Sequence, residues 1–432
     1  MTIKELYFII YFISLALHKL NLKTKNTKNV QLFSGLSIKK SFILNRTGGF
    51  LSKSNIKELI MDKNTRLSSF SKWIAPIHFK KVYEQAENLK QDYYTKKLTT
   101  EAYIKILLFA QLHETESLEA MSDALLDEDF QKALGFESIS ASQLSRKNNE
   151  VDPGILAALF LDLVYQIQGF HKKRLNSSMP LKIIDSSTLP LNLTNYKWAT
   201  FRKTKAGVKL HLRLVFMDKN TVYPEKAAIT PAKEHDRNQL EVLVDDKEAM
   251  YVFDRGYVDY ERFDRMTDDG YFFVSRIKKN AVTRDVYSFS LPPESTVLSD
   301  KMVYIGSTQN RAENVFRLLE VSDTKGNILR LITNRFDLSA DEISDIYRSR
   351  WAIELFFKWL KQHVEIKHFY GMSKTALQNQ IYIALITYCL HVLIQLETKS
   401  KKSLLRISRW LKAALWKPAY IWLRRFEKKA VP

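Results

Sequence analysis

Four side chains able to carry charge or donate hydrogen bonds recur at short intervals between residues 346 and 363. Tyr347, Arg350, Glu354 and Lys361 are three, four and seven residues apart. The segment IYRSRWAIELFFKWLKQH has no Pro or Gly and repeats apolar residues at helical spacing, which predicts one continuous helix. At about 100° per residue, the four side chains fall within an arc of roughly 60°. Such a stripe cannot pack against an apolar core without charged partners, so it is either a solvated salt-bridge face or part of a functional site.

Two upstream aspartates favour a functional site. Asp185 ends the run LKIID and Asp254 ends MYVFD, and small or turn-forming residues follow each run. This pattern predicts buried strands that each deliver a carboxylate at the carboxyl end, where ligands bind in open α/β sheets. One such Asp could instead cap the next helix. Together with Glu354, they would form three convergent carboxylates, which repel unless a hard divalent cation lies between them. A two-metal carboxylate site supports phosphodiester displacement.

With these residues, the chain resembles the DDE transposases of bacterial insertion sequences, in the family named after insertion sequence four. The family signature Y-x2-R-x3-E-x6-K is matched without departure by four residues: Tyr347, Arg350, Glu354 and Lys361. The resemblance spans roughly residues 61 to 400. It implies that two Mg²⁺ or Mn²⁺ ions are bound by three carboxylates: Asp185, Asp254 and Glu354. It also implies that three residues hold phosphates of the transposon end: Tyr347, Arg350 and Lys361. The planar guanidinium and the ammonium both suit phosphate oxygens.

The expected fold class is α/β, with a ribonuclease-H-like catalytic domain that a β-rich insertion interrupts. Residues 176–277 and 336–397 are assigned to the catalytic domain. Apolar runs predict its strands at 181–185, 209–216, 221–230, 250–254 and 271–277, and its helices at 237–246 and 260–269. Glu354 follows Asp254 by 100 positions, which is too long for a simple connection. Residues 278–335 contain several β-like runs, so they are assigned to the insertion, which the resemblance also leads one to expect.

Residues 61–175 are predicted to form a helical N-terminal DNA-binding domain. The run SASQLSRKNN, residues 140–149, is the helix best suited to meet a DNA groove, with Arg146 and Lys147 as its contacts. The alternative is a helical platform that packs on the catalytic domain.

Four polar residues near the predicted strands each allow two interpretations. Lys209 and His211 point to the same face of their strand, where they could approach a phosphate or a metal. A half-exposed strand face is the simpler interpretation, and we favour it. His235 and Asp236 resemble a metal-binding pair, but Asp236 is better explained as the cap of the following helix, with His235 exposed.

The charge of the chain is concentrated at its two ends. Residues 1–60 carry ten Lys or Arg and two acids, and residues 398–432 carry eleven and one. The formal net charge is +20, so the remaining segment carries only +2. The basic and aromatic tail 398–432 suits either DNA contact or the packing of a terminal helix. Residues 1–60 are interpreted as an upstream extension before Met61.

Composition limits the other possibilities. The 432 residues suffice for several cores, and the single Cys389 excludes an intramolecular disulfide and a cysteine-based zinc site. No G-x4-G-K-[ST] loop supports ATP-driven chemistry. The apolar run LYFIIYFISLAL is too short to span a bilayer, and IYIALITYCLHVLIQL reads as a buried helix.

We therefore expect a metal-dependent transposase that cuts double-stranded DNA at transposon ends and joins the 3′ hydroxyl to target DNA. Its partners are those two DNAs and a second copy in a synaptic homodimer, with no membrane and no ATP, in the bacterial cytoplasm. The alternatives are a ribonuclease-H-like nuclease or a domesticated DNA-binding protein without strand transfer, and a DNA-binding regulator whose acidic cluster is structural. The sequence leaves open the terminal repeats, the excision route and the target preference.

Overall fold

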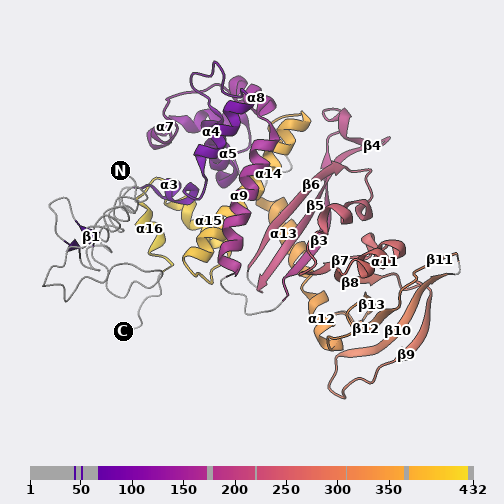
Figure 1. Ribbon diagram of the computed structural model, residues 1–432. Helices are drawn as coiled ribbons and strands as arrows, with labels where there is room; N and C mark the ends of the chain where they lie inside the picture. Colours follow the sequence, from indigo (N-terminus) through magenta and orange to yellow (C-terminus); the bar gives the residue numbers. More distant parts are fainter. Residues whose placement is uncertain are drawn as a thin grey trace, which may run out of the picture. The chain divides into compact units, whose positions relative to one another are not determined.

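The computed structural model describes residues 43–44, 50–51, 67–172, 179–218, 221–307, 309–363 and 369–426 (Figure 1). The chain divides into two compact units, Met1–Lys63 and Asn64–Pro432. In the first unit, β1 (Ile43–Leu44) pairs antiparallel with β2 (Phe50–Leu51). The rest of the predicted extension 1–60 lies outside the described residues.

One mixed sheet runs through the second unit. In spatial order, its strands are β11 (Asn310–Arg311), β10 (Val297–Ser307), β12 (Phe316–Ser322), β13 (Ile328–Thr333), β8 (Phe272–Ile277), β7 (Met250–Phe253), β3 (Leu181–Leu191), β5 (Lys205–Asp218) and β4 (Thr200–Arg202). Two further strands lie off this path: β6 (Thr221–Pro231) pairs with β5, and β9 (Thr283–Ser288) pairs with β10. The pairs β3–β7 and β7–β8 are parallel, and the other described pairs in this sheet are antiparallel. The mixed α/β class is therefore confirmed.

The strands of residues 278–335 continue the sheet. β13 pairs antiparallel with β8 through Thr333 and Val274, and β12, β10 and β9 follow outward. In Figure 1 this region curves away below the long strands β3, β5 and β6. One face of it packs against the helix α11 (Tyr260–Asp268) through an aromatic core. α12 (Ala340–Arg348) covers the other face.

The helix predicted for 346–363 is broken into two, α12 and α13 (Trp351–His363), which corrects that prediction. The backbone tightens at Ser349, whose hydroxyl bonds to the carbonyl of Ile346 at 2.5 Å. Arg350 N then bonds three residues back, to the carbonyl of Tyr347. Such i to i−3 bonds end the α-helical ladder, and polar Ser and Asp side chains favour such helix ends. The helix predicted for 237–246 is also shorter, because it consists of η3 (Asp236–Gln239) and α10 (Leu240–Leu243).

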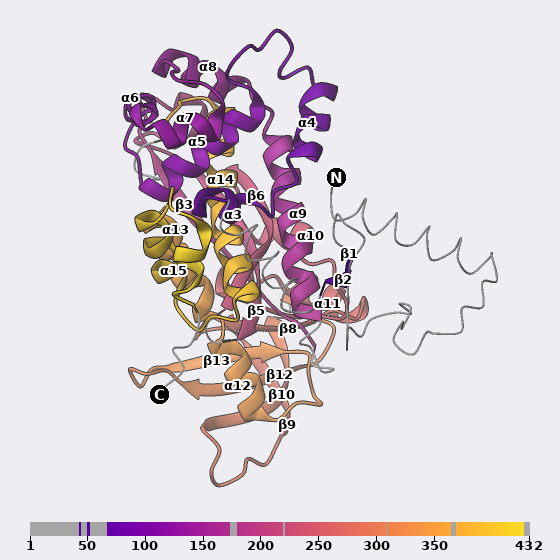
Figure 2. The same ribbon diagram turned by 90° about the vertical axis from the view of Figure 1, so that its left-hand side faces the viewer.

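A helical layer lies beside the sheet (Figure 2). Its members are α3 (Ser69–Ile74), α4 (Phe79–Asn88), α5 (Thr100–His113), α6 (Leu118–Asp123), α7 (Glu128–Leu134), α8 (Ala141–Glu150), α9 (Pro153–Lys172), α14 (Lys374–Glu397), α15 (Leu404–Ala413) and α16 (Ala419–Leu423). These helices share one hydrophobic core with β3, β5 and β6. The helices before and after the sheet in sequence therefore form a single packed body with it.

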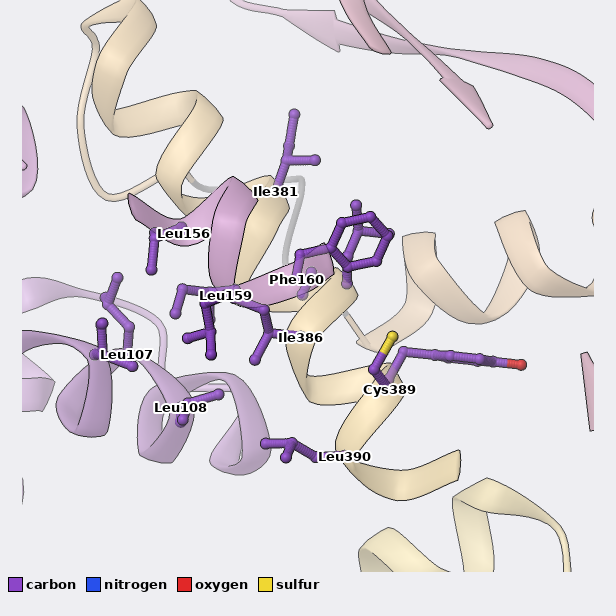
Figure 3. Close-up of a cluster of buried hydrophobic side chains, with 14 of the residues drawn as sticks. Leu107, Leu108, Leu156, Leu159, Phe160, Ile381, Ile386, Cys389 and Leu390 are labelled. Carbon is purple, nitrogen blue, oxygen red and sulfur yellow. The ribbon is translucent and has the colours of Figure 1, made fainter. Parts of the chain in front are cut away.

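α14 is the central helix of this core. Figure 3 shows Ile381, Ile386 and Leu390 of α14 packed toward leucines of α5 and α9. Two described helices, α9 and α14, are long and apolar enough to cross a membrane, but 89% of the α14 window is buried in the protein. The prediction that this run is a buried helix is confirmed, and Cys389 is buried within it.

A carboxylate-lined candidate active site

A cleft of about 540 Å³ opens between β3, β7 and α13. Its lining residues are Asp185, Ser186, Ser187, Asp254, Arg350, Glu354, Phe357, Lys358, Lys361 and Gln362. The three carboxylates proposed from the sequence thus share one cleft with two residues of the basic signature. Sequence reasoning missed Lys358, although its position one helical turn after Glu354 could have indicated it.

The parallel pairing of β3 and β7 brings two of the carboxylates to the same edge. The register aligns Ile184 with Phe253, so the next residues, Asp185 and Asp254, emerge side by side. β3 does not end there but runs six residues further, to Leu191, on the antiparallel partner β5. The prediction that Asp185 ends its strand is therefore wrong, because only the parallel pairing with β7 ends there.

Asp254 serves two purposes in the structure. It is the N-cap of η4 (Arg255–Tyr257), and its Oδ1 accepts a hydrogen bond from Gly256 N at 2.7 Å. A side chain at position 256 would meet this carboxylate, since an added Cβ would lie 2.9 Å from Asp254 Oδ1. Gly256 therefore leaves room for the carboxylate that lines the cleft.

Asp185 is in an unfavourable environment for a negative charge. Burial raises the pKa of Asp185 to about 7, and the nearby charge of Asp254 adds to this rise. The backbone N–H of Ser186 donates to Asp185 Oδ1 at 2.7 Å and acts in the opposite direction, as does the Arg350 guanidinium. A cation next to Asp185 would relieve this repulsion.

Arg350 supplies the positive charge that these carboxylates meet in the structure. It lies at the break between α12 and α13, with Nη1 3.6 Å from Asp185 Oδ2 and with Nη2 bonded to Glu354 Oε1. Burial alone would lower the pKa of Arg350, but Tyr347, Glu354 and Asp185 raise it overall. The guanidinium therefore stays protonated and bridges the two acids.

The two ends of the signature lie in different environments. Tyr347 is only 8% exposed and packs in the core beneath α12, and burial raises the pKa of its hydroxyl. The Arg350 guanidinium lies 5.8 Å from the Tyr347 ring. Lys361 and Lys358 are exposed on α13 at the cleft. The two exposed lysines can therefore bind an anion at the cleft, whereas the buried Tyr347 ring packs against the Arg350 guanidinium.

No three His, Cys, Asp or Glu side chains among the described residues are close enough together to hold a metal ion as they stand. The donor set nevertheless fits a hard cation, because it consists of carboxylate oxygens whose repulsion raises the pKa of Asp185. The Glu354 carboxylate already accepts a hydrogen bond from Arg350, so that bond must break before Glu354 can bind a metal ion.

Three of the four polar residues near the strands, Lys209, His211 and Asp236, form a polar network beside the cleft. Asp236 does not cap η3, which corrects that prediction: its Oδ1 accepts from Ser186 Oγ at 2.5 Å and lies 3.1 Å from Lys209 Nζ. His211 is fully buried and its Nε2 lies 2.8 Å from Thr230 Oγ1. Burial lowers the pKa of His211 to about 4, so it is neutral. The expected half-exposed face is therefore wrong, whereas His235 is exposed as predicted.

The structure separates the two cations predicted on the helix 140–149. Arg146 is exposed on α8. Lys147 is 5% exposed, and its Nζ lies 2.6 Å from Asp92 Oδ1 and 3.1 Å from the carbonyl of Gln91. This buried ion pair corrects the expectation that Lys147 contacts DNA, because its ammonium is already enclosed by protein partners.

Comparison with known proteins identifies the class. Residues 176–390 match the family described as transposase DDE domain, and residues 65–137 match a domain of unknown function, DUF4372. A probable transposase for insertion sequence element IS5377 of Geobacillus stearothermophilus is 28% identical over 298 residues, which cover 68% of this chain and 76% of the relative. A putative transposase for insertion sequence element IS4SA of Synechocystis is 24% identical, with 67% and 82% covered. The solved piggyBac transposase synaptic complex with hairpin DNA aligns at 12% identity over 86% of this chain and 82% of that one, with a TM-score of 0.41.

The family match and the relatives define a DDE transposase, an enzyme that catalyses DNA transposition. The chain belongs to the transposase DDE domain family, and its homologues include transposases of insertion sequence elements such as IS4SA.

Proposed function

We propose that this transposase cleaves DNA at the ends of an insertion sequence and joins the freed 3′ hydroxyl to target DNA, with Asp185, Asp254 and Glu354 as its catalytic carboxylates. The observation that supports this most is their common cleft, at the edge where two parallel strands deliver adjacent aspartates. The cleft also carries cations for an anionic substrate. We propose the bacterial cytoplasm as its location, where such DNA is found.

The strand order supports a ribonuclease-H-like core. The strands β6, β5, β3, β7 and β8 lie in that spatial order, with antiparallel pairing among the first three and parallel pairing from β3 to β8. In this arrangement the first and fourth strands in sequence, β3 and β7, are neighbours. The first two acidic residues of the site thereby meet although 69 residues separate them in the chain.

We assign metal binding to the acidic residues of the cleft and phosphate binding to its basic residues. Two Mg²⁺ or Mn²⁺ ions held by Asp185, Asp254 and Glu354 would activate the attacking oxygen and stabilise the leaving oxygen. Lys358 and Lys361 hold the phosphates that flank the bond to be cut. Arg350 must release Glu354 before that carboxylate can serve as a ligand, and a substrate phosphate is a suitable new partner for its guanidinium.

The full reaction acts on double-stranded DNA, both transposon ends and target, and we propose a homodimer that holds two ends together. Its test is the cleavage of labelled terminal-repeat DNA with Mg²⁺ or Mn²⁺ by the intact protein and by Glu354→Gln. The substitution should abolish cleavage and leave DNA binding intact. Cleavage that survives it would exclude Glu354 from the catalytic set. Joining of pre-cleaved ends to a target plasmid separates a transposase from a nuclease.

A further inference from the structure

A basic hairpin lies at the far end of the ladder that carries Asp185. The strands β3 and β5 pair from Leu181 to Leu191, and β5 begins at the hairpin turn after β4. The turn itself is Lys203–Thr204. From Asp185 to Leu191 the chain advances six residues, which corresponds to about 20 Å of extended strand. β4 is the edge strand of the sheet, beside the first residues of β5 (Figure 1).

The segment that contains the hairpin, residues 186–217, carries only positive charges. No Asp or Glu occurs from Ser186 to Met217. Four exposed cations stand on the hairpin and the turn that leads to it: Lys197, Arg202, Lys203 and Lys205. None of these four forms an ion pair with any described carboxylate, whereas Lys209 and Arg213, further along β5, are paired with acids. An unneutralised cluster of this kind attracts an anionic surface.

A second cleft, of about 600 Å³, adjoins the hairpin. Trp198 Nε1 donates to the carbonyl of Met372 at 2.8 Å, and Tyr196 lines the cleft. The Trp198 side chain remains 42% exposed. The polar side chains of this cleft are hydrogen-bonding amides and hydroxyls: Ser145, Asn149, Asn192, Asn195, Tyr196, Tyr370 and Ser373. Groups of this kind bond to phosphate, sugar and base edges without adding negative charge.

We propose that this basic hairpin, residues 197–205, is a second DNA-contact surface that binds the duplex backbone about six base pairs from the phosphate cut at Asp185. The spacing follows from about 20 Å of strand and about 3.4 Å per base pair. The hairpin cations neutralise phosphates, and the exposed indole of Trp198 packs against a deoxyribose in the groove. The proposal rests on the proposed function, because it takes the carboxylate cleft as the site of cleavage.

The first test measures binding of a labelled duplex that carries the terminal repeat and its flanking DNA. A variant with Lys197→Ala, Arg202→Ala, Lys203→Ala and Lys205→Ala should bind about 10- to 100-fold more weakly at about 0.15 M salt. The slope of log affinity against log salt should become less steep by about three. The matched control replaces the same residues by Lys197→Arg, Arg202→Lys, Lys203→Arg and Lys205→Arg, and should retain both affinity and slope.

The second test maps the contact without removing charge clusters. Cys389 is the only cysteine and is fully buried, so Lys203→Cys introduces a single exposed thiol. An iron chelate on that thiol should cut the duplex about six base pairs from the scissile phosphate. The same experiment is repeated with duplexes shortened on the transposon side or on the flanking side of the scissile phosphate. Only one of the two truncations should abolish the cuts, and it identifies the side that the hairpin contacts.

The outcomes separate this proposal from the proposed function. If the intact protein binds and cleaves the duplex, but the alanine variant binds equally well or the tethered iron cuts nowhere near the predicted position, the hairpin proposal is overturned alone. If the intact protein neither binds nor cleaves terminal-repeat DNA, both proposals are overturned.

Discussion

At the scale of single residues, the Arg350 guanidinium links the carboxylates of Asp185 and Glu354. Asp185 is raised in pKa by burial and by Asp254, and Arg350 is the positive group that reaches both Asp185 and Glu354. Burying like charges in this way costs stability, and functional sites concentrate such perturbed groups. The cleft therefore holds electrostatic strain that a bound cation or a phosphate can exploit.

The raised pKa of Asp185 predicts a pH-dependent loss of stability. In the unfolded chain Asp185 ionises near pH 4, and in the folded protein only near pH 7. Between these values the folded state binds the extra proton, so its stability falls as the pH rises from 4 to 7 and then levels off. Asp185→Asn should therefore be about 1–3 kcal/mol more stable than the intact protein at pH 8 without divalent cations.

Urea unfolding at pH 4 and pH 8 checks this prediction. The advantage of Asp185→Asn should largely vanish near pH 4, where the folded carboxyl is protonated and the unfolded one is only about half ionised. The control is Asp323→Asn, because hydrogen bonds in the turn before β13 lower the pKa of Asp323, the opposite direction from Asp185. Asn at position 185 that destabilises the protein at pH 8 would contradict the assigned charge strain.

Arg350 should compete with metal for the carboxylates. A unit charge at about 4 Å contributes up to roughly 4 kcal/mol at a protein surface, so the loss of this guanidinium frees Glu354 and Asp185 for a cation. Arg350→Ala should bind Mn²⁺ about tenfold more tightly in the absence of DNA, while binding DNA more weakly. Calorimetric titration with Mn²⁺ measures the first effect. Arg348→Ala removes a cation that pairs with Asp345 outside the cleft, and its Mn²⁺ affinity should stay unchanged.

At the scale of elements, α8 combines an exposed cation with a buried one. Lys147 bonds to Asp92, and Asp92 also accepts from Thr100 N and Oγ1 at the start of α5. Lys147→Ala would leave Asp92 with less compensation in a mostly buried site, so it should destabilise the protein by about 3 kcal/mol. Arg146→Ala should leave the stability within about 0.5 kcal/mol and lower only the affinity for DNA.

Thermal unfolding and DNA titration of the two single variants separate these roles. If Lys147→Ala folds with unchanged stability, the ion pair with Asp92 contributes nothing to the packing of α8 on α5. If Arg146→Ala binds terminal-repeat DNA as well as the intact protein does, α8 serves as a packed platform only.

Several elements could be predicted from the sequence because local signals are strong there. The apolar runs that give β3, β5, β6, β7 and β8 are bounded by turn residues, and each of these strands is found. The exact end of β3 could not be predicted, because the polar residues after Asp185 resemble a turn, and only the pairing with β5 shows that the strand continues. The break at Ser349 and the burial of Lys147 likewise depend on tertiary partners that spacing does not reveal.

At the scale of the molecule, the segment between α15 and α16 is hydrogen-bonded to α3, the first of the described helices. Ser69 N and Phe70 N donate to the carbonyls of Lys417 and Leu415, each at 2.9 Å, so α3 is tied to the segment before α16. Trp416 packs on Phe70 at 5.3 Å between ring centroids. In the described part of the basic and aromatic tail, residues 398–426, the aromatic residues therefore pack against the protein and the cations lie at the surface.

This division predicts different outcomes for the two kinds of residue in the tail. Trp422 is fully buried, and Trp422→Ala should destabilise the protein by about 3–5 kcal/mol, because it leaves a cavity between α16 and α3. Lys399, Lys401 and Lys402 are exposed, so replacing all three by Ala should leave the urea midpoint nearly unchanged. The same triple variant tests DNA contact, since a weaker salt dependence of binding would show that these lysines meet phosphates. If Trp422→Ala instead unfolds at the same urea concentration as the intact protein, the tail is a dispensable appendage, and the connection between the two ends of this unit does not contribute to its stability.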